Sequence, residues 1–466
     1  MKRLISCVLA LLYVMAGFAS GTWILHGKEY RVDTLYHAYI GPGTTQTSIK
    51  LAGPVNLRVF YTTTDLKNEN VDVRAIKHKD TLTGLGTVSN AAESHSTSNR
   101  SYFAGINADF FSSSMPCGIT VVDGEVYCSD QASGWSLFGI DANKIPYSGG
   151  GDFYVKLTAP DYSTAELSAM NLERETNGLV LYSSRKGANT GTDGNGSEVV
   201  LIPDGEGNFL TPGATVRMRV QGNPNHAGSM PIPDNGYILS GSGTKESFVS
   251  NLSEGDEVEV RCAIRFNGFT GGKIQQALGG CPMLVSGGKV LDTENALDHL
   301  TSAQPRTAVG YNTEKNKLVM LVADGRSSIS VGPISKVLAD IMIYAGCSEA
   351  MNFDGGGSST FYVKGEGVIN QPSDGSERSV TDGLYLSTDA PQNDVTITTI
   401  RFMDYAKTLN QGDAYTPVIY GYNQYGVLVD RNVEGVTLSC GSSLGTITND
   451  GTTLNASGSG THMLTA

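Results

Sequence analysis

Three consecutive glycines, Gly355, Gly356 and Gly357, constrain the fold of this chain more than any other feature of its sequence. A short apolar run at residues 350–353 precedes them, and a segment rich in β-branched and aromatic residues at 359–363 follows, so we expect strand, loop and strand. Glycine loses more conformational freedom on folding than other residues, so a run of it is tolerated mainly where the backbone needs positive φ or approaches another group closely. The loop is therefore either a glycine-rich hairpin turn or the wall of a ligand site.

Polar residues around the glycines favour the ligand site. Asn352, Asp354 and Ser358 place a carboxamide, a carboxylate and a hydroxyl beside bare backbone N–H groups. This combination is typical of an oxyanion or phosphate site. No Gly-Lys-Ser/Thr follows the glycines, which excludes a nucleotide P-loop.

The N-terminus has the pattern of a secretory signal. Lys2 and Arg3 precede an apolar run at residues 4–14, and small residues follow before position 20, so we predict a signal peptide over residues 1–19. The alternative is a membrane anchor, but the run is shorter than the roughly 20 residues that a span requires. We expect an exported protein without a transmembrane anchor, in the periplasm, outside the cell or at its surface.

The charge balance excludes one class of partner. Loss of Lys2 and Arg3 reduces the 33 basic residues to 31 against 46 acidic ones, a net charge of −15. Such a surface repels polyanions, so we expect no nucleic-acid binding, and an anionic substrate must be met by local arginines and backbone dipoles. Oligomeric state is left open by the sequence.

The cysteines and histidines argue against a zinc site. Six of the seven cysteines remain after Cys7 leaves with the signal, and neither a C-x-x-C nor an H-E-x-x-H spacing occurs. Cys117 and Cys128 flank a segment that the sequence predicts to be a hairpin. They could form a disulfide in an oxidising compartment or remain buried thiols, and the sequence does not decide between these alternatives.

Composition and pattern predict a β-rich chain with many turns and few helices. The chain has 57 glycines and 17% charged residues, and its apolar runs are short and separated by turn residues. We expect a mixed-sheet domain at 20–388 with a β subdomain inserted at about 153–266, a linker at 389–394 and a small β-sandwich at 395–466. The clearest helix follows Gly332 and Pro333, where apolar residues recur with helical spacing up to Gly346.

Further polar residues lie at the ends of predicted strands. Asn107 and Asp109 are two residues apart and therefore share a face of one strand, with aromatic residues on both sides. Asp324 follows another apolar strand and precedes Gly325. Its carboxylate either helps to form a turn, as in many Asp-Gly pairs, or is a catalytic group.

Six polar or glycine-containing motifs follow one another along the chain: Asn107-Ala108-Asp109-Phe110-Phe111, Gly280-Cys281-Pro282, Arg306-Thr307-Ala308-Val309-Gly310, Asp324-Gly325-Arg326, Asn352 to Ser359, and Asn370 to Asp374 with Arg378. Taken together and in this order, they resemble the phosphodiester glycosidase family over about residues 30–388. The resemblance implies an α+β catalytic domain that hydrolyses the glycosidic bond of a sugar 1-phosphodiester of the N-acetylhexosamine type, releasing free sugar and a phosphomonoester. The segment after residue 395 resembles a bacterial Ig-like module that stops before its last strand is complete.

The chemistry of such a substrate suggests roles for these residues. Phosphate leaves an acetal carbon readily, so stabilisation of charge by arginine and backbone N–H groups matters more than protonation of the leaving oxygen. A carboxylate would act at the anomeric carbon or on water. The candidate catalytic residues are Asp354, Asp324 and Asp109. The candidate substrate-binding residues are Asn107, Arg306, Thr307, Asn352, Gly355, Gly356, Gly357, Ser358, Asn370, Asp374 and Arg378.

Two alternatives stay open at this point. The chain could be a non-catalytic cell-surface protein that binds glycans or mediates adhesion. Asp109, Asp324 and Asp354 could also hold Ca²⁺ with backbone carbonyls, although no EF-hand pattern is present, and no other cofactor is implied.

Overall fold

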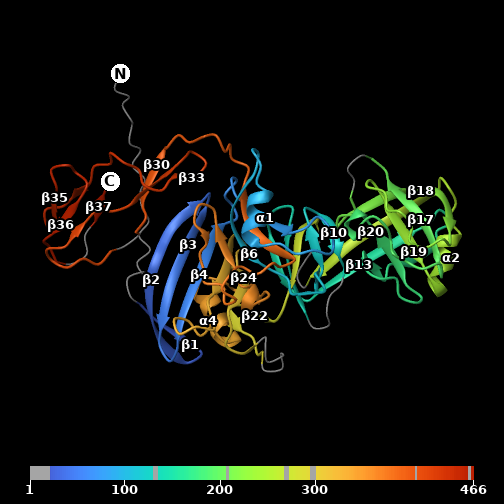
Figure 1. The fold of residues 1–466 in the computed structure, drawn as a ribbon, viewed down its shortest axis with the longest axis horizontal. Coiled ribbons are helices and arrows are strands. Elements are labelled where there is room, and N and C mark those ends of the chain that lie inside the picture. The colour runs from blue at the N-terminus through green and yellow to red at the C-terminus, as the bar shows by residue number, and fades with distance from the viewer. Residues whose placement is uncertain are drawn as a thin grey trace, which may run out of the picture.

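The computed structural model describes residues 21–129, 135–205, 209–266, 272–293, 301–404, 407–459 and 463–466. The predicted β-rich α+β fold with few helices is confirmed. Three parts follow one another along the long axis of the molecule: the C-terminal segment, a pair of packed sheets, and the inserted β subdomain (Figure 1).

A large sheet and a small sheet form the central part. The large sheet runs in the order β1 (Gly21–Leu25), β2 (Lys28–Gly41), β3 (Thr44–Ala52), β4 (Asn56–Asp65), β25 (Lys317–Ala323), β24 (Arg306–Tyr311), β26 (Glu349–Asn352), β22 (Met283–Ser286) and β23 (Lys289–Val290). The small sheet runs in the order β28 (Gly367–Val368), β27 (Phe361–Val363), β6 (Ser101–Asn107), β29 (Asp382–Thr388) and β5 (Asp72–Lys77). The pairings described in both sheets are antiparallel, which is more uniform than the mixed sheets expected.

The alternation of side chains along β25 explains how these sheets are layered. Met320 and Val322 belong to the core that the large sheet shares with the small one, whereas Val319 and Leu321 pack against helix α4 (Ser335–Tyr344). Helix α1 (Val88–Ser94) covers the other face of the small sheet. The central part is therefore a helix–sheet–sheet–helix sandwich, and α4 is the helix that apolar spacing predicts.

The glycine loop crosses from one sheet to the other. β26, before it, pairs with β24 and β22, and β27, after it, pairs with β6 and β28. The hairpin interpretation of this loop is therefore wrong, because its flanking strands do not pair with each other. Between them, Gly356–Ser358 form a 3-10 turn.

A third sheet joins the sandwich to the insertion. It has the order β10 (Glu125–Cys128), β9 (Thr120–Val122), β21 (Ile274–Gly280), β11 (Ser136–Asp141) and β12 (Pro146–Gly149), and a small hairpin, β7 (Phe111–Ser112) and β8 (Met115–Pro116), precedes it.

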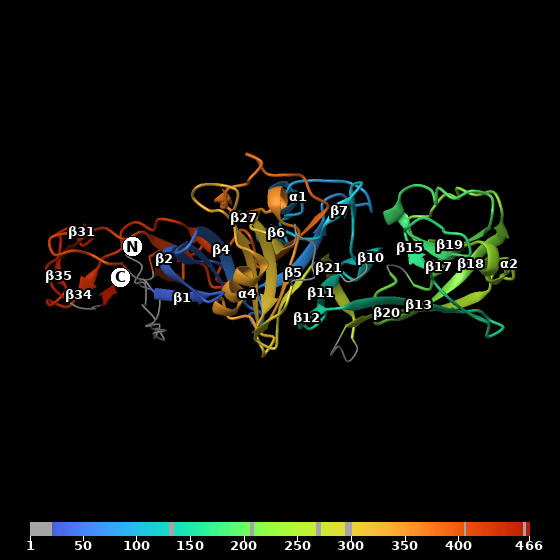
Figure 2. The same ribbon diagram turned by 90° about the horizontal axis from the view of Figure 1, so that it is seen from below.

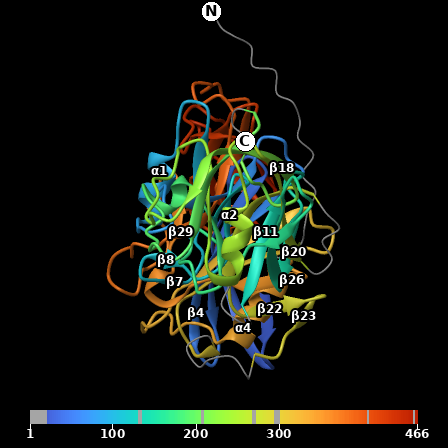
Figure 3. The ribbon, with the colours of Figure 1, turned by 90° about the vertical axis from the view of Figure 1, so that its right-hand side faces the viewer.

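The insertion is built on an eight-stranded sheet. Its order is β14 (Thr164–Glu166), β13 (Gly151–Thr158), β20 (Glu257–Phe266), β18 (Thr215–Asn225), β17 (Ser197–Pro203), β19 (Tyr237–Gly241), β16 (Leu179–Tyr182) and β15 (Ala169–Met170), with α2 (Glu246–Ser250) against it. The long pair β13 and β20 extends outward from the third sheet (Figure 2). Viewed along the long axis, α2 and β18 lie in front of the central sheets (Figure 3).

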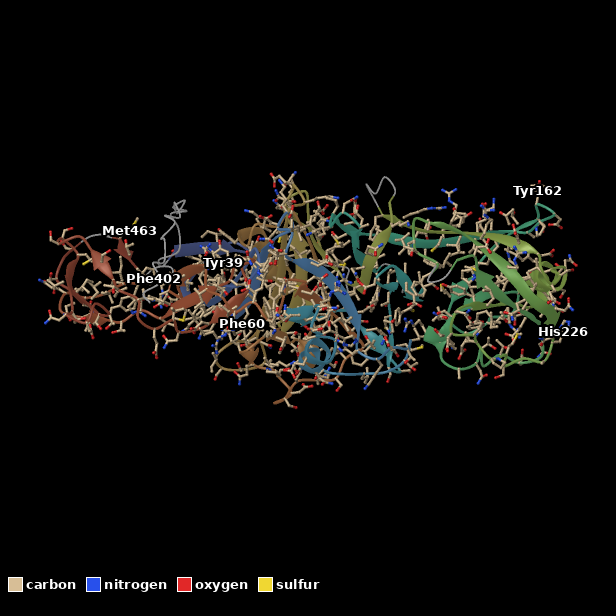
Figure 4. All side chains as sticks on the ribbon, turned by 90° about the horizontal axis from the view of Figure 1, so that it is seen from above. Tyr39, Phe60, Tyr162, His226, Phe402 and Met463 are labelled. Carbon is tan, nitrogen blue, oxygen red and sulfur yellow. The ribbon has the colours of Figure 1, made fainter. Side chains whose placement is uncertain are left out.

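The C-terminal segment forms small sheets of its own. One sheet has the order β30 (Thr399–Phe402), β32 (Ile419–Tyr422) and β33 (Leu428–Asp430). A second has the order β31 (Ala414–Tyr415), β36 (Leu454–Ala456) and β35 (Gly445–Ile447). In a third, β34 (Ser439–Cys440) pairs with β37 (Leu464–Thr465). The Tyr422 hydroxyl donates to the Tyr39 carbonyl at 2.8 Å, on the side of the central part where Figure 4 labels Tyr39. An Ig-like identity for this segment stays a prediction.

Three sequence predictions concern export, membranes and cysteines. The predicted signal peptide lies outside the described residues. Within the part of the chain that the structure describes, no helix has the length and apolar character needed to cross a membrane. The structure contains no disulfide between Cys117 and Cys128. The Cys117 backbone N–H donates to the Phe110 carbonyl at 2.8 Å.

Candidate active site

Strand ends from both sheets meet around the glycine loop. Because the strands are antiparallel, the beginning of β24 lies beside the ends of β25 and β26, with Arg306 opposite Ala323 and Ala308 opposite Asn352. In the small sheet, Asn107 at the end of β6 lies opposite Gly383 at the beginning of β29. Register thus gathers residues that are far apart in the sequence.

Asp354 is half-buried at the start of the loop. Its N–H donates to the Ala108 carbonyl at 2.8 Å. Burial raises the pKa of its carboxyl to about 6, although hydrogen bonds from the Ser358 hydroxyl and the Gly355 N–H and the charge of Arg378 act in the opposite direction. Such a carboxyl group changes protonation state within the pH range where many enzymes work.

Each of the three glycines faces a different arginine. A Cβ on Gly355 would lie 3.7 Å from Cδ of Arg306 and 2.8 Å from the Pro305 carbonyl oxygen. A Cβ on Gly356, whose φ is +63°, would lie 2.9 Å from Nη2 of Arg326. A Cβ on Gly357 would collide with the Arg378 guanidinium. The glycines therefore allow three cationic side chains to approach one short turn.

The three arginines differ in their environments. Arg306 is 2% exposed, and its Nη2 donates to the Ser302 carbonyl at 2.5 Å. Burial, reinforced by the charge of Arg326, lowers the pKa of Arg306 to about 10, so it stays protonated at neutral pH. Arg326 is exposed and donates from Nε to Oε1 of Gln304 at 2.7 Å.

Arg378 is paired with a carboxylate at the edge of the loop. Its Nε and Nη2 donate to Oδ2 of Asp374 at 2.8 and 2.6 Å, and its Nη1 donates to the Ser358 hydroxyl at 3.4 Å. The side chains of Arg378 and Asp374 are 40% and 35% exposed. Asp374 thus orients Arg378, and both remain within reach of a bound molecule.

Asn107 and Thr307 hold the loop rather than face solvent. Asn107 is fully buried and donates from Nδ2 to the Asp354 carbonyl at 2.7 Å, while its Oδ1 accepts from the Thr307 hydroxyl at 2.7 Å and the Thr360 N–H at 3.1 Å. This carboxamide joins both sheets to the backbone of Asp354.

The other two predicted asparagines are also buried. Asn352 donates from Nδ2 to the carbonyls of Cys281 and Phe353 at 2.8 and 2.6 Å, and its Oδ1 has no partner within the described residues. Asn370 accepts the Phe361 N–H at 2.7 Å and donates to the Ser359 carbonyl at 3.0 Å.

Asp324 positions the segment that carries Arg378. The side chain is 3% exposed, and its Oδ1 accepts from the Gln371 N–H at 2.8 Å and from Nδ2 of Asn370 at 3.5 Å. Burial raises its pKa, and these two hydrogen bonds lower it. These contacts tie the residues after Asn370 to the end of β25.

Asp109 is enclosed by backbone. Its Oδ2 accepts from the N–H groups of Gly118 and Gly279 at 2.9 and 3.3 Å, and a Cβ on either glycine would lie 2.7 Å from that oxygen. Its Oδ1 is buried and has no hydrogen-bond partner among the described residues. Burial, followed by the negative charge of Asp382, raises the pKa of Asp109 well above its usual value.

Asp382 and Lys77 complete this buried group and were not predicted as site residues. Asp382 is fully buried, and its Oδ1 accepts the Asp109 N–H at 2.9 Å. Burial raises the pKa of Asp382, and the positive charge of Lys77, which is 2% exposed and lies opposite Asp382 in the β5–β29 register, acts in the opposite direction. A carboxylate at the first position of a strand was the sequence signal that could have identified Asp382. Arg326 was quoted within a motif but was likewise not predicted as a site residue.

Calcium binding by Asp109, Asp324 and Asp354 stays a prediction. Asp109 is enclosed by Gly118 and Gly279, and Asp324 is bound to Gln371 and Asn370. In the described ranges, no group of three or more His, Cys, Asp or Glu side chains is arranged to hold a metal ion.

Comparison with known proteins agrees with the resemblance of the sequence motifs. Residues 212–387 match the family model of phosphodiester glycosidases. Over this segment the chain is similar to that family. The matched segment contains Arg306, Asp324, Asp354 and Arg378, whereas Asn107 and Asp109 precede it.

Relatives and solved structures agree with the fold. The SPbeta prophage-derived uncharacterized protein YomE of Bacillus subtilis (strain 168) is 40% identical over 88 residues, which is 19% of this chain and 13% of that protein's length. A hypothetical protein from Synechocystis has a TM-score of 0.57 at 16% identity, with 74% of this chain and 62% of that chain covered. A protein from Burkholderia pseudomallei K96243 that is described as exported has a TM-score of 0.53 at 22% identity, with 71% and 74% covered.

Proposed function

We propose that this protein is an exported hydrolase that cleaves the glycosidic bond of a sugar 1-phosphodiester of the N-acetylhexosamine type. The observation that carries the proposal is the arrangement of Arg306, Arg326 and Arg378 against three successive glycines, with Asp354 at the start of the same loop. This arrangement offers cationic groups for a phosphate beside a carboxylate for the sugar.

The arginines suit the charge that develops on the leaving group. When the anomeric C–O bond breaks, a phosphodiester monoanion becomes a phosphomonoester dianion, so cationic groups bind the transition state more tightly than the substrate. Arg326 and Arg378 are accessible to the phosphate oxygens, and Arg306 supplies a buried positive charge behind them. Guanidinium groups also match phosphate geometry.

Asp354 acts in its charged form at the anomeric carbon. With a pKa of about 6 the group is mostly ionised at pH 7, and a carboxylate there stabilises the oxocarbenium-like transition state or takes a proton from the attacking water. Asn107 donates to the Asp354 carbonyl and the Ala108 carbonyl accepts the Asp354 N–H, so the backbone that carries this carboxylate is held on both sides.

Export is supported by two observations. The sequence predicts a secretory signal, and the structurally similar Burkholderia protein is described as exported. Secretion of the full-length chain, with sequencing of the mature N-terminus, tests this part of the proposal.

The activity test uses N-acetylglucosamine 1-(methyl phosphate) in water enriched in ¹⁸O. Cleavage of the glycosidic bond yields free N-acetylglucosamine carrying the label and unlabelled methyl phosphate. Cleavage of a P–O bond instead yields a labelled phosphate product and would replace the glycosidase by a phosphodiesterase. Binding of the sugar phosphodiester without any product would favour the glycan-binding alternative.

A further inference from the structure

Four exposed aliphatic residues lie on the chain segments next to Arg326. Ile329 is 54% exposed, Val331 37%, Ile334 36% and Val55 39%. These four residues, the aliphatic patch, are among the fourteen exposed large hydrophobic residues of the described chain, although three of them come from one short connection between β25 and α4. Single exposed apolar residues need no explanation, but a group of them marks a binding surface.

The connection that carries the patch has a fixed backbone. Ser327 and Ser330 close a turn through a 3.0 Å N–H to carbonyl bond, a 3.1 Å bond from the Ser330 N–H to the Ser327 hydroxyl, and a 3.2 Å bond from that hydroxyl to the Ser330 carbonyl. The Ser330 hydroxyl donates to the Asp324 carbonyl at 2.7 Å and accepts the Arg58 N–H at 3.0 Å. The aliphatic groups are therefore presented by an ordered turn, not by a loose loop.

Backbone hydrogen bonds place the patch next to the anion site. The Arg326 N–H donates to the Val331 carbonyl at 3.2 Å, and the Val331 N–H donates to the Asn56 carbonyl at 3.2 Å, which brings Val55 to the same place. Arg326 has a φ of +58°, an uncommon conformation for a residue with a side chain, and its guanidinium lies against Gly356. Phosphate-binding and aliphatic surfaces are therefore continuous through Arg326.

We propose that the aliphatic patch binds the alcohol part of the substrate, and that this alcohol is an aliphatic chain. The inference rests on the proposed function: a phosphodiester has an ester oxygen on each side, so a sugar at Asp354 and a phosphate at Arg326 leave the alcohol to continue beyond the arginine. Gln304 and Ser373 contact the Arg326 guanidinium itself, and the exposed large hydrophobic residues on the segments next to Arg326 are Ile329, Val331, Ile334 and Val55. Their aliphatic side chains favour CH₂ groups over a second sugar or a charged group.

The test measures binding of the phosphomonoester product, so it does not require turnover. Methyl phosphate and hexyl phosphate carry the same charge, and calorimetry on the full chain compares their affinities below the micelle concentration. Hexyl phosphate is expected to bind at least about tenfold more tightly, because its additional CH₂ groups leave water. In the double variant Ile329→Ser and Val331→Ser, this preference should fall below about threefold.

The chain offers a matched control in Ile24. It is 53% exposed, close to the value for Ile329, and its N–H donates to the Tyr344 hydroxyl at 3.1 Å. Tyr344 is the last residue of α4, whereas the aliphatic patch lies at the beginning of that helix. Ile24→Ser should retain the full preference for hexyl phosphate. All substituted residues are exposed, so the variants should fold as the wild type does, which circular dichroism checks.

The outcomes separate this inference from the proposed function. Equal affinities for the two phosphates would overturn the aliphatic subsite, and so would a preference that survives in the double variant. If the methyl phosphodiester is hydrolysed but hexyl phosphate binds no more tightly than methyl phosphate, the proposed glycosidase activity is supported and the aliphatic subsite is contradicted. If hexyl phosphate binds more tightly but neither the methyl nor the hexyl phosphodiester of N-acetylglucosamine is hydrolysed, the subsite is supported and the glycosidase activity is contradicted.

Discussion

Asp354 and Asp109 are two carboxyl groups of one site in different environments. Asp354 is half-buried, receives hydrogen bonds from Ser358 and Gly355, and feels the positive charge of Arg378. Asp109 is 1% exposed, leaves one oxygen without a partner in the described structure, and lies beside the negative charge of Asp382. Of these two carboxyl groups, Asp354 combines partial access with a cationic neighbour, which favours it over Asp109 as the reacting group in the proposed function.

Replacement of Asp354 should have the largest effect on hydrolysis. Asp354→Asn keeps the shape and removes the charge, so kcat should fall at least about a hundredfold, the scale of general base catalysis. Single-turnover kinetics on the N-acetylglucosamine phosphodiester measures this, with thermal unfolding on the same preparation.

The control for this variant is Asp161→Asn. Asp161 is an exposed carboxylate that accepts the Ser163 N–H at 2.9 Å, so it too closes a turn, but on the insertion. It should leave the rate unchanged. A folded Asp354→Asn protein with near wild-type turnover, or one that merely melts earlier, would reduce Asp354 to a turn-forming residue.

Loss of Arg326 should be the next largest effect. Arg326→Gln removes one positive charge from the phosphate site, so kcat/KM should fall about tenfold or more, the scale of a hydrogen bond to a charged group. Arg219→Gln is the matched control, because Arg219 is an exposed arginine paired with Glu257 on the insertion. Identical kinetics of the two variants would remove Arg326 from the site.

The pH dependence of kcat/KM should depend on Asp382 as well as on Asp354. If Asp354 acts as the charged form, kcat/KM rises with pH through a midpoint at about 6. Asp382 carries a negative charge that raises the pKa of Asp354, so Asp382→Asn should move this midpoint to lower pH. A midpoint that stays in place, with a folded variant, would show that the buried pair and Asp354 are electrostatically independent.

The smallest effect should appear in stability rather than in rate. Burial raises the folded-state pKa of Asp109, so wild-type stability falls as pH rises from the unfolded value of about 4 through the folded-state pKa. Asp109→Asn lacks this ionisation, so its Tm relative to wild type should increase between pH 5 and pH 8 by about 2–4 °C. Parallel curves of Tm against pH for the variant and wild type over that range would contradict a raised pKa of Asp109 in the folded state.

Local patterns predicted much of the fold, because they depend on neighbours in sequence. Helix α4 follows from apolar residues at helical spacing between Gly332 and Gly346, and the glycine loop follows from its own composition. The loop's path between two sheets could not be predicted, because it depends on the pairing of β26 with β24 and of β27 with β6.

Residue roles were harder to predict than residue positions. Asn107 and Asp324 look like site residues in the sequence, and both lie in the site region, but their hydrogen-bonding groups are directed to Asp354, Thr360 and Gln371. Such partners are set by tertiary contacts. Asp382 was missed for the same reason, since its importance comes from the Asp109 N–H that it accepts.

The glycine loop passes from the large sheet to the small one, so the site lies at the boundary between the two sheets. Residues 352–361 connect them: the first of these residues belongs to β26 and the last to β27. Sliding of one sheet over the other would therefore pull Asp354 away from Arg306 before either sheet lost its own strands. Hydrolytic activity should therefore appear late in folding, when the large and small sheets have packed together in their final positions. It should be lost first when the two sheets begin to slide over each other.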